Sequence, residues 1–529
     1  MAPRLIVLGW DSATFDVVDP LVEQGRLPAI GELMEGGSRA RLMSTWPPMT
    51  DCAWTSAFTG SNPGTHGIFG SWYRAPGAYG CRYFSSRDRR APAVWEMTED
   101  VRWLVWNIPM TFPPDRIPGV MVAGYGAPPG AEFCEPRSFQ SELARRWSLE
   151  DLLDLAPHSS LEVFLDGLLR GLEAQAEALP WAIAESGADC ALAVWPHVDR
   201  AQHFFWRFRG TSHPLAGAVD RVYEAMDRAT AAIVEAFPES DVMIVSDHGA
   251  GDLKGDVNVG AWLASHGRAG YAQPRRSVLS DIAWAMPPAV RKFGRRLAPG
   301  LAKQAMGAFL VKQLGPFDWS RTDAFVGVHN DLWLNLKGRE PEGTIEPADA
   351  ADVRDEIVGG LMELVDPSTG ERVFAAAHLR DDIYRGPALD LAPDVMLDPW
   401  SNGYRVAVKR EPSEDIVIPP ASLAGVDEAW SSDHRPEGIF VAAGPRIAAA
   451  SLDPLSLYDV TPSALALLEQ PVPPGLDGAV ATSALDAGFL DRSPVREGVR
   501  ANERDVQGGY SEEEASAVAE HLKDLGYID

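Results

Sequence analysis

The stretch Leu5-Ile6-Val7-Leu8-Gly9-Trp10-Asp11 is an apolar run that ends directly on a carboxylate. Two later runs have the same form, since residues 190–195 lead to Asp199 and residues 242–246 lead to Asp247. Apolar runs of this length, rich in β-branched residues, are typical of strands buried in a parallel sheet. Ligands bind beyond the carboxyl ends of such strands, so we expect the three aspartates to converge at one edge of a sheet.

The segments between these runs have helical spacing. Apolar residues recur at helical intervals over residues 161–179 and again over residues 215–237. Strands that alternate with helices predict an α/β fold, with a doubly wound, mostly parallel sheet and helices on both faces.

The chain of 529 residues is too long for one simple core. We expect the first part of the α/β core over residues 1–265 and a basic, helical cap or insert over residues 266–330. The remainder of the core, which includes His434, is expected over residues 331–490 and a C-terminal tail over residues 491–529. Within the insert, nine Lys or Arg residues over 268–312 face one acid, Asp281. Such a segment is either a lid or membrane-surface helix pair that attracts anions, or a cap with solvated charges, and charge runs favour the second interpretation.

The charge balance excludes one class of partner. The formal net charge is −28, from 47 basic and 75 acidic residues. A nucleic-acid polymer needs clustered Lys and Arg for its phosphates, so none is expected as a partner. A small phosphorylated substrate is compatible with this charge, because a bound metal ion can supply local positive charge.

The expected compartment is the cytoplasm. Four cysteines (Cys52, Cys81, Cys134 and Cys190) match no CxxC pattern, and their scarcity fits a reducing compartment. The first apolar run is too short for the core of a signal peptide. No stretch approaches the roughly 20 apolar residues of a transmembrane helix, so no membrane-spanning segment is expected. The oligomeric state is left open.

Histidines accompany two of the three strand-end aspartates. His203 follows Asp199 by four residues, which places both on one face of a helix, and His248 follows Asp247 directly. Carboxylate oxygens mixed with imidazole nitrogens suit zinc or a similar divalent ion. His434 is a single histidine in a predicted loop, and its local pattern alone favours a surface residue.

Thr50 is a candidate nucleophile. Two prolines force an extended approach, and Thr50 then lies where a helix can begin. The free N–H groups of a helix N-terminus bind phosphate well, and metal coordination can activate a hydroxyl. The local pattern alone favours the alternative that Thr50 only caps the helix.

Several stretches together resemble the type I phosphodiesterase/nucleotide pyrophosphatase family of the alkaline phosphatase superfamily. The resemblance spans about residues 4 to 480. The matching stretches are Gly9-Trp10-Asp11-Ser12-Ala13-Thr14, Pro47-Pro48-Met49-Thr50, Thr59-Gly60-Ser61-Asn62-Pro63-Gly64-Thr65-His66-Gly67-Ile68, Asp199 with His203, Ser246-Asp247-His248-Gly249, Asn335-Leu336-Lys337-Gly338-Arg339-Glu340, His434-Arg435-Pro436-Glu437-Gly438 and Pro473-Pro474-Gly475-Leu476-Asp477-Gly478.

The resemblance implies an alkaline-phosphatase-like fold with two bound divalent metal ions, usually Zn²⁺. It implies that Thr50 is the nucleophile, which changes the expectation for this residue and for His434. The ligand set that it implies is Asp199, His203 and His434 for one metal, and Asp11, Asp247, His248 and the Thr50 oxygen for the other.

One position departs from the family pattern. Nucleotide pyrophosphatases place an asparagine, which binds a phosphate oxygen, where this chain has Ser71. We expect the Ser71 hydroxyl and the backbone N–H of Asp51 to hold the non-bridging phosphate oxygens. The shorter reach of serine leaves the preference for diesters or pyrophosphates open.

The expected function is hydrolysis of a phosphodiester or pyrophosphate bond through a phosphothreonine intermediate. A phosphomonoesterase or phosphotransferase on the same scaffold is the first alternative, and a catalytically inactive ligand-binding protein is the alternative of another class. A sulfatase is disfavoured, because the residues after Cys52 lack the proline and arginine that formylglycine formation requires.

Overall fold

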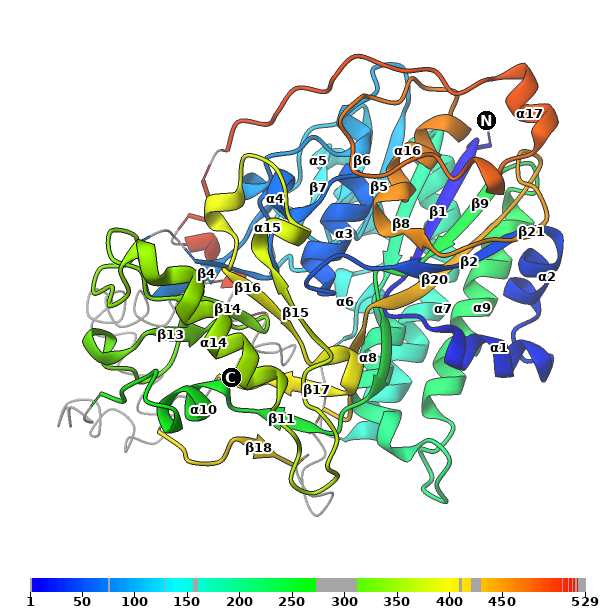
Figure 1. Ribbon diagram of the computed structural model, residues 1–529. Coiled ribbons are helices and arrows are strands. Elements are labelled where there is room, and N and C mark those ends of the chain that lie inside the picture. Colours follow the sequence, from blue (N-terminus) through cyan, green and yellow to red (C-terminus); the bar gives the residue numbers. More distant parts are fainter. Residues whose placement is uncertain are drawn as a thin grey trace, which may run out of the picture.

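The computed structural model describes most of the chain (Figure 1). Most of the basic segment expected at residues 266–330 lies outside the described residues. In the C-terminal tail, the Ser-x-x-Glu pattern of residues 511–514 predicts a helix over residues 511–525. Its capping pair is present, since the Glu514 N–H donates to the Ser511 hydroxyl at 3.2 Å, and most of the residues after 515 lie outside the described residues. The described residues are 2–74, 77–128, 130–155, 160–272, 312–408, 412–419, 430–506, 508–511, 513–515, 517–518 and 521.

A ten-stranded sheet forms the centre of the molecule. Its order is β21-β2-β20-β9-β1-β8-β5-β6-β7, with β22 also paired to β2. The five strands from β9 to β6 are parallel, whereas β20 and β7 join them antiparallel on either side. The expected α/β fold with a mostly parallel central sheet is confirmed. The strands are β1 (Leu5–Trp10), β2 (Ser38–Met43), β5 (Trp103–Trp106), β6 (Gly119–Val122), β7 (Cys134–Glu135), β8 (Cys190–Trp195), β9 (Asp241–Val245), β20 (Glu437–Ala443), β21 (Ala450–Ser451) and β22 (Leu455–Ser456).

Alternate side chains of each central strand enter two different cores, one on each face of the sheet. In β1, Ile6, Leu8 and Trp10 belong to one core, and Leu5 and Val7 belong to the other. This two-sided burial explains why the strands read as continuous apolar runs. The first core is built with α1 (Phe15–Glu23), α2 (Pro28–Gly36), α5 (Arg137–Leu143), α6 (Leu149–Leu152), α7 (Leu161–Ser186), α8 (His197–Phe205) and α9 (Ala218–Ala236), and the second with α3 (Thr50–Thr59), α16 (Val460–Leu467) and α17 (Ala487–Arg492).

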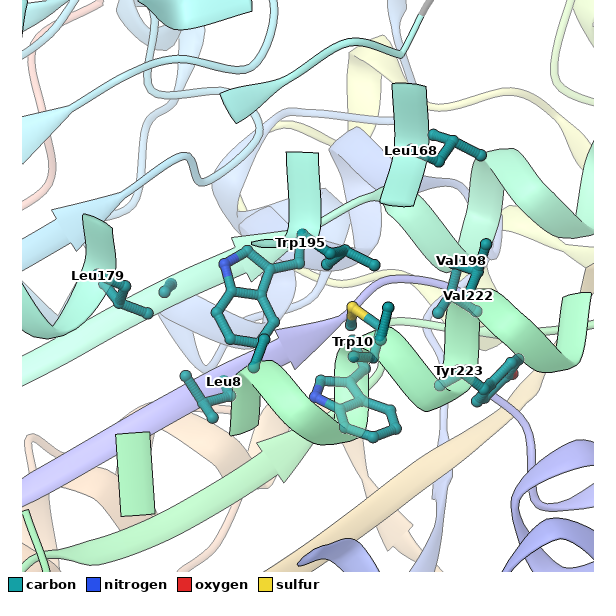
Figure 2. Close-up of a cluster of buried hydrophobic side chains, with 14 of the residues drawn as sticks. Leu8, Trp10, Leu168, Leu179, Trp195, Val198, Val222 and Tyr223 are labelled. Carbon is teal, nitrogen blue, oxygen red and sulfur yellow. The ribbon is translucent and has the colours of Figure 1, made fainter. Parts of the chain in front are cut away.

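Tryptophans from neighbouring strands fill the first core. Trp10 of β1 and Trp195 of β8 are paired in register and point into the same cluster as Leu168, Val222 and Tyr223 from the covering helices (Figure 2). Both rings are buried, so neither can stack on a ligand. This packing holds the carboxyl ends of the two strands at the same level.

A second, antiparallel sheet lies beside the central one and has a core of its own (Figure 1). The segment expected as the remainder of the α/β core, residues 331–490, is therefore divided. Its first part builds the second sheet, and the chain returns to the central sheet only at β20. The elements of this region are β13 (Ala324–Val326), β14 (Asp331–Leu334), β15 (Ala376–Leu379), β16 (Val395–Asp398), α10 (Val259–Ser265) and α14 (Ala350–Met362).

Small sheets and short helices connect the two main sheets. They are β10 (Gly249–Asp252) with β19 (Ser432–Arg435), β11 (Gly255–Val257) with β17 (Tyr404–Val406) and β18 (Val417–Ile418), β4 (Gly80–Tyr83) with β3 (Trp72–Arg74) and β12 (Lys312–Gln313), and the helices α4 (Pro63–His66) and α15 (Arg380–Ile383). Among the described helices, none combines the length and the apolar character needed to cross a membrane.

His66, the last residue of α4, is buried as a neutral ring. Its Nδ1 accepts the N–H of Ile68 at 3.1 Å, so Nε2 carries the proton and donates to the Ser56 hydroxyl at 2.9 Å. Burial, together with the charge of Arg89, lowers the pKa of His66 to about 3. Since the unfolded chain has the ordinary pKa of about 6.5, it binds more protons than the folded chain between these two values.

We therefore expect His66 to destabilise the protein in acid. Its contribution is complete above about pH 6.5 and is lost toward pH 3, with a slope of at most about 1.4 kcal/mol per pH unit. In His66→Gln, which cannot be protonated, the unfolding midpoint in urea should fall less steeply between about pH 6.5 and pH 4. His213→Gln, at an exposed histidine, is the matched control. Equal pH slopes for wild type and His66→Gln would contradict this assignment.

Candidate functional site

The carboxyl ends of three parallel strands bring together residues that are far apart in the chain. Asp11 directly follows β1, and Asp247 follows β9 after one residue. Asp199 lies in the first turn of α8, just beyond β8. Because β1 pairs in parallel with both β8 and β9, Trp10 lies opposite Trp195 and Gly9 opposite Val245. The three aspartates therefore lie at one edge of the sheet, as the strand pattern predicts.

Six of the predicted ligands form two buried groups. Asp199, His203 and His434 form one group, and Asp11, Asp247 and His248 form the other. Within each group the candidate ligand atoms all lie within 4.8 Å of one another.

The two groups adjoin each other. The rings of His248 and His434, one from each group, stack with centroids 3.7 Å apart. His434 also lies with its Nε2 3.7 Å from Asp199 Oδ1. It belongs to β19, not to a loop, and the pairing of β19 with β10 carries it to the site. The sequence around His434 contains no sign of this long-range pairing.

Each of the three histidines is held by its Nδ1 against a backbone carbonyl. A ring that donates from Nδ1 in its neutral form directs the lone pair of Nε2 away from that carbonyl, which suits a metal ligand. Nε2 of His203 lies 3.1 Å from Asp199 Oδ1, and Nε2 of His248 lies 3.1 Å from Asp247 Oδ2. The acceptors for His203, His248 and His434 are the carbonyl oxygens of Ser432, Gly249 and Pro48, at 3.0, 3.1 and 2.8 Å.

The donor set of this site fits divalent cations. Oδ1 of Asp11 is buried without a hydrogen-bond partner among the described residues, whereas Oδ1 of Asp199 and Oδ2 of Asp247 face the Nε2 atoms of His203 and His248. Burial raises the pKa of Asp11 well above its ordinary value, and the charges of Asp247 and Asp199 raise it further. Buried carboxylates that repel one another are costly unless a cation neutralises them.

His248 reports the same excess of negative charge. Burial by itself lowers the pKa of His248, but Asp247, Asp11 and Asp199 together raise it to about 10. Without a cation, a proton on this ring therefore supplies positive charge that the carboxylates require. A neutral imidazole ligand beside a divalent ion would meet the same requirement.

The second carboxylate oxygens of Asp11 and Asp247 are held by groups that the sequence analysis did not identify. Asp11 Oδ2 accepts the indole N–H of Trp54 at 3.0 Å, and Asp247 Oδ1 accepts the backbone N–H of Ser12 at 3.2 Å. Trp54 lies one turn after Thr50 in α3 and is fully buried. Its four-residue spacing from Thr50 is the feature of the sequence that could have indicated its position beside the site. These contacts leave the other carboxylate oxygens directed to the two groups.

Thr50 begins α3 but does not cap it. The N-cap residue is Met49, which makes no side-chain capping bond. The Thr50 hydroxyl lies 3.3 Å from Nε2 of His248, at the border of the second group. The first turn of a helix has N–H groups without intrahelical acceptors, so a hydroxyl, an anion-binding helix end and the ligand groups meet here.

Ser71 and Asp51 interact with each other. The Ser71 hydroxyl lies beside the Asp51 carboxylate and stabilises its charged form. The pKa of Asp51 is raised to about 6, because burial and, to a lesser degree, the charge of Asp247 raise it more than the Ser71 hydroxyl lowers it. A hydroxyl has one proton, so Ser71 cannot donate to Asp51 and to a phosphate oxygen at the same time.

Comparisons with known proteins agree with the fold and the motifs. The family model of type I phosphodiesterase/nucleotide pyrophosphatase matches residues 5–427. No curated protein matches the chain. The crystal structure of phosphonoacetate hydrolase from Sinorhizobium meliloti 1021 in complex with phosphonoformate is similar, with a TM-score of 0.52 and 16% sequence identity, over 87% of this chain and 94% of that chain. The resemblance that the sequence motifs predict is thereby confirmed, and the chain is a hydrolase that belongs to the type I phosphodiesterase/nucleotide pyrophosphatase family.

Proposed function

We propose that the chain hydrolyses a phosphodiester or pyrophosphate bond of a small substrate through a phosphothreonine on Thr50, with two divalent metal ions, of which Zn²⁺ is the expected kind. The observation that carries this proposal is the position of the Thr50 hydroxyl. It lies 3.3 Å from His248, at the first turn of a helix and beside two buried groups of carboxylates and imidazoles. A nucleophile, an anion-binding helix end and cation ligands are the components that phosphoryl transfer needs.

The two groups divide the ligands between two cations. Asp199, His203 and His434 would hold one of them. Asp11, Asp247, His248 and the Thr50 oxygen would hold the other. When bound, the cations would supply the positive charge that offsets negative charge developing on the phosphoryl oxygens.

Thr50, Asp51 and Ser71 have separate roles in the proposed reaction. The Thr50 hydroxyl loses its proton to solvent as its oxygen attacks phosphorus, and the bond to the leaving oxygen breaks as the new bond forms. The leaving oxygen takes up a proton, and water then hydrolyses the phosphothreonine, which releases the phosphoryl group and restores the hydroxyl. The backbone N–H of Asp51, at the second position of α3, donates to a non-bridging oxygen. Ser71 donates to another such oxygen only when the substrate displaces its bond to Asp51.

Substrate class is decided at Ser71 and in the surrounding loops. The Ser71 hydroxyl already interacts with Asp51, so it is a weaker phosphate ligand than the asparagine side chain of nucleotide pyrophosphatases. This difference supports a substrate other than a generic nucleotide diester. A screen of metal-loaded protein with an aryl monoester, an aryl diester, a dinucleotide and a phosphonate separates a phosphodiesterase from a monoesterase. An inactive binding protein would turn over none of them.

Metal content is the first test of this proposal. Purified protein should contain about two divalent ions per chain, most of them zinc. Chelation should abolish hydrolysis and lower the thermal unfolding midpoint by at least about 5 °C, because the buried carboxylates lose their counter-ions. Elemental analysis and calorimetry measure both effects. Metal-free protein with full activity would sink the two-metal assignment.

Thr50→Ala tests the nucleophile. We expect turnover to fall by roughly 10³-fold or more while the metal content and the fold are kept, because the reaction loses its covalent step. Thr50→Ser should retain a measurable fraction. Thr65→Ala is the matched control, since it removes a hydroxyl that donates to the Arg385 carbonyl at 3.1 Å and should change turnover less than about twofold. Near wild-type turnover in Thr50→Ala would mean that water attacks directly.

Ser71→Asn tests the substrate preference. The amide reaches further than a hydroxyl and has a second N–H, so kcat/KM on an aryl diester should rise, whereas Ser71→Ala should lower it by about tenfold. Repeating Ser71→Ala in an Asp51→Asn background separates the two contacts of the hydroxyl. A loss that persists there indicates contact with the phosphate, and a loss that disappears indicates that Ser71 acts by holding Asp51.

A further inference from the structure

One histidine of the second sheet holds the loop that carries Ser71. Nε2 of His329 accepts two backbone N–H groups, from Ser71 at 3.0 Å and from Trp72 at 3.2 Å. A ring nitrogen can accept only when it carries no proton, so the ring is in the tautomer with the proton on Nδ1. His329 is only 8% exposed. The contact is therefore a buried link between the second sheet and the site.

The histidine is itself fixed. It lies in the turn between β13 and β14, and its N–H donates to Oδ1 of Asp331 at 2.8 Å. The side chain of the neighbouring Asn330 accepts the N–H of Val406 at 3.0 Å, and its carbonyl accepts the N–H of Leu397 at 3.0 Å. Strands β16 and β17 thus hold the turn, and the ring has a defined position from which to hold the loop.

The backbone at Gly70 is shaped to admit this ring. A Cβ atom at Gly70 would lie 2.2 Å from Cδ2 of His329 and 2.5 Å from its Nε2. The φ angle of Gly70 is +141°, which side chains rarely adopt. Only glycine suits this position, because any side chain would clash with the His329 ring and would disfavour the backbone conformation.

The other contacts of Ser71 lead to the nucleophile. Its carbonyl accepts the N–H of Phe84 at 3.0 Å, and its hydroxyl interacts with the carboxylate of Asp51 and stabilises the charged form of that group. Asp51 is the second residue of α3 and follows Thr50 directly. A continuous series of contacts therefore runs from His329 through Ser71 to the first turn of the helix that carries the nucleophile.

We propose that His329 is a positioning residue of the active site, which fixes the Ser71 loop and through it the first turn of α3 for phosphate binding. This inference rests on the proposed function, since it assigns the phosphate to that turn. In this proposal His329 acts on the site through the two N–H groups that it accepts, from Ser71 and Trp72. Its loss should let the loop move, and a displacement of about 1 Å at such a site can cost orders of magnitude in rate.

A double-mutant cycle with full-length, zinc-loaded protein tests the role of His329. His329→Ala should lower kcat on an aryl diester by roughly tenfold or more with bound zinc unchanged. His329→Gln, whose amide oxygen reaches the place of Nε2, should restore part of the rate. In a Ser71→Ala background, where the bond to Asp51 is already lost, His329→Ala should cost less than about threefold more.

A second variant guards against misfolding of His329→Ala. Gly70→Ala pushes against the same ring from the other side and should reproduce the loss, whereas His213→Ala, at an exposed histidine, should leave the rate unchanged. Equal losses from His329→Ala with and without Ser71 would overturn the inference. Loss of zinc in both His329→Ala and Gly70→Ala would also overturn it, because the residue would then be a support of the metal groups.

Binding of inorganic phosphate separates this inference from the proposed function. Calorimetry on zinc-loaded protein should show a phosphate affinity at least about fivefold weaker in His329→Ala than in wild type, with rescue in His329→Gln. If wild type hydrolyses none of the tested substrates but the affinities differ in this way, the proposed function fails and the inference stands. Equal affinities, or no phosphate binding by wild type, would refute the inference.

Discussion

The repulsion among buried carboxylates is the constraint on which the site depends. Asp11, Asp199 and Asp247 are placed together because three parallel strands end at one level, and that level is set by in-register pairing and by tryptophans packed in the core. The burial that stabilises the sheet thus forces negative charges into a region where water cannot screen them. Positive charge offsets this repulsion, whether it comes from a proton on His248 or from a bound cation, so the stability of the core depends on what the site binds.

Some of this arrangement was predictable from local sequence, and the reasons differ between residues. The strand ends were predictable because two-sided burial produces unbroken apolar runs, and the four-residue spacing of Asp199 and His203 matches the helix on which both lie. His434 was not predictable from its surroundings, because it reaches the site through the pairing of β19 with β10. In this pairing His434 lies opposite Ala250, which is far from it in the chain. For Thr50, propensity favoured a cap, and the structure instead has Met49 as the cap residue. The sequence also does not indicate how residues 331–490 are divided between two sheets, because short strands of an antiparallel sheet and of a parallel core look alike in sequence.

The second sheet contacts the Ser71 loop through a residue that no motif indicates. Its own core is separate from the two cores of the central sheet, yet one of its turns places His329 against the Ser71 loop. A histidine that accepts two backbone N–H groups has no characteristic spacing, and its importance depends wholly on what lies opposite. In the sequence, this contact is reflected only by the glycine at position 70, because a side chain there would clash with the His329 ring. Tertiary contacts of this kind set the limit of what sequence patterns can predict about a site.

The carbonyl of Pro48 has a consequence for how the chain can vary. It accepts from His434 of one ligand group, and two residues later Thr50 lies against His248 of the other group. Residues 48–50 therefore span the distance between the two groups, because Pro48 contacts one group and Thr50 contacts the other. The side chain of Met49 takes no part in either contact and makes no capping bond, so its identity can change. A residue inserted or deleted here would shift one end against the other, so variation between related chains should be confined to substitutions at this point, never to changes in length.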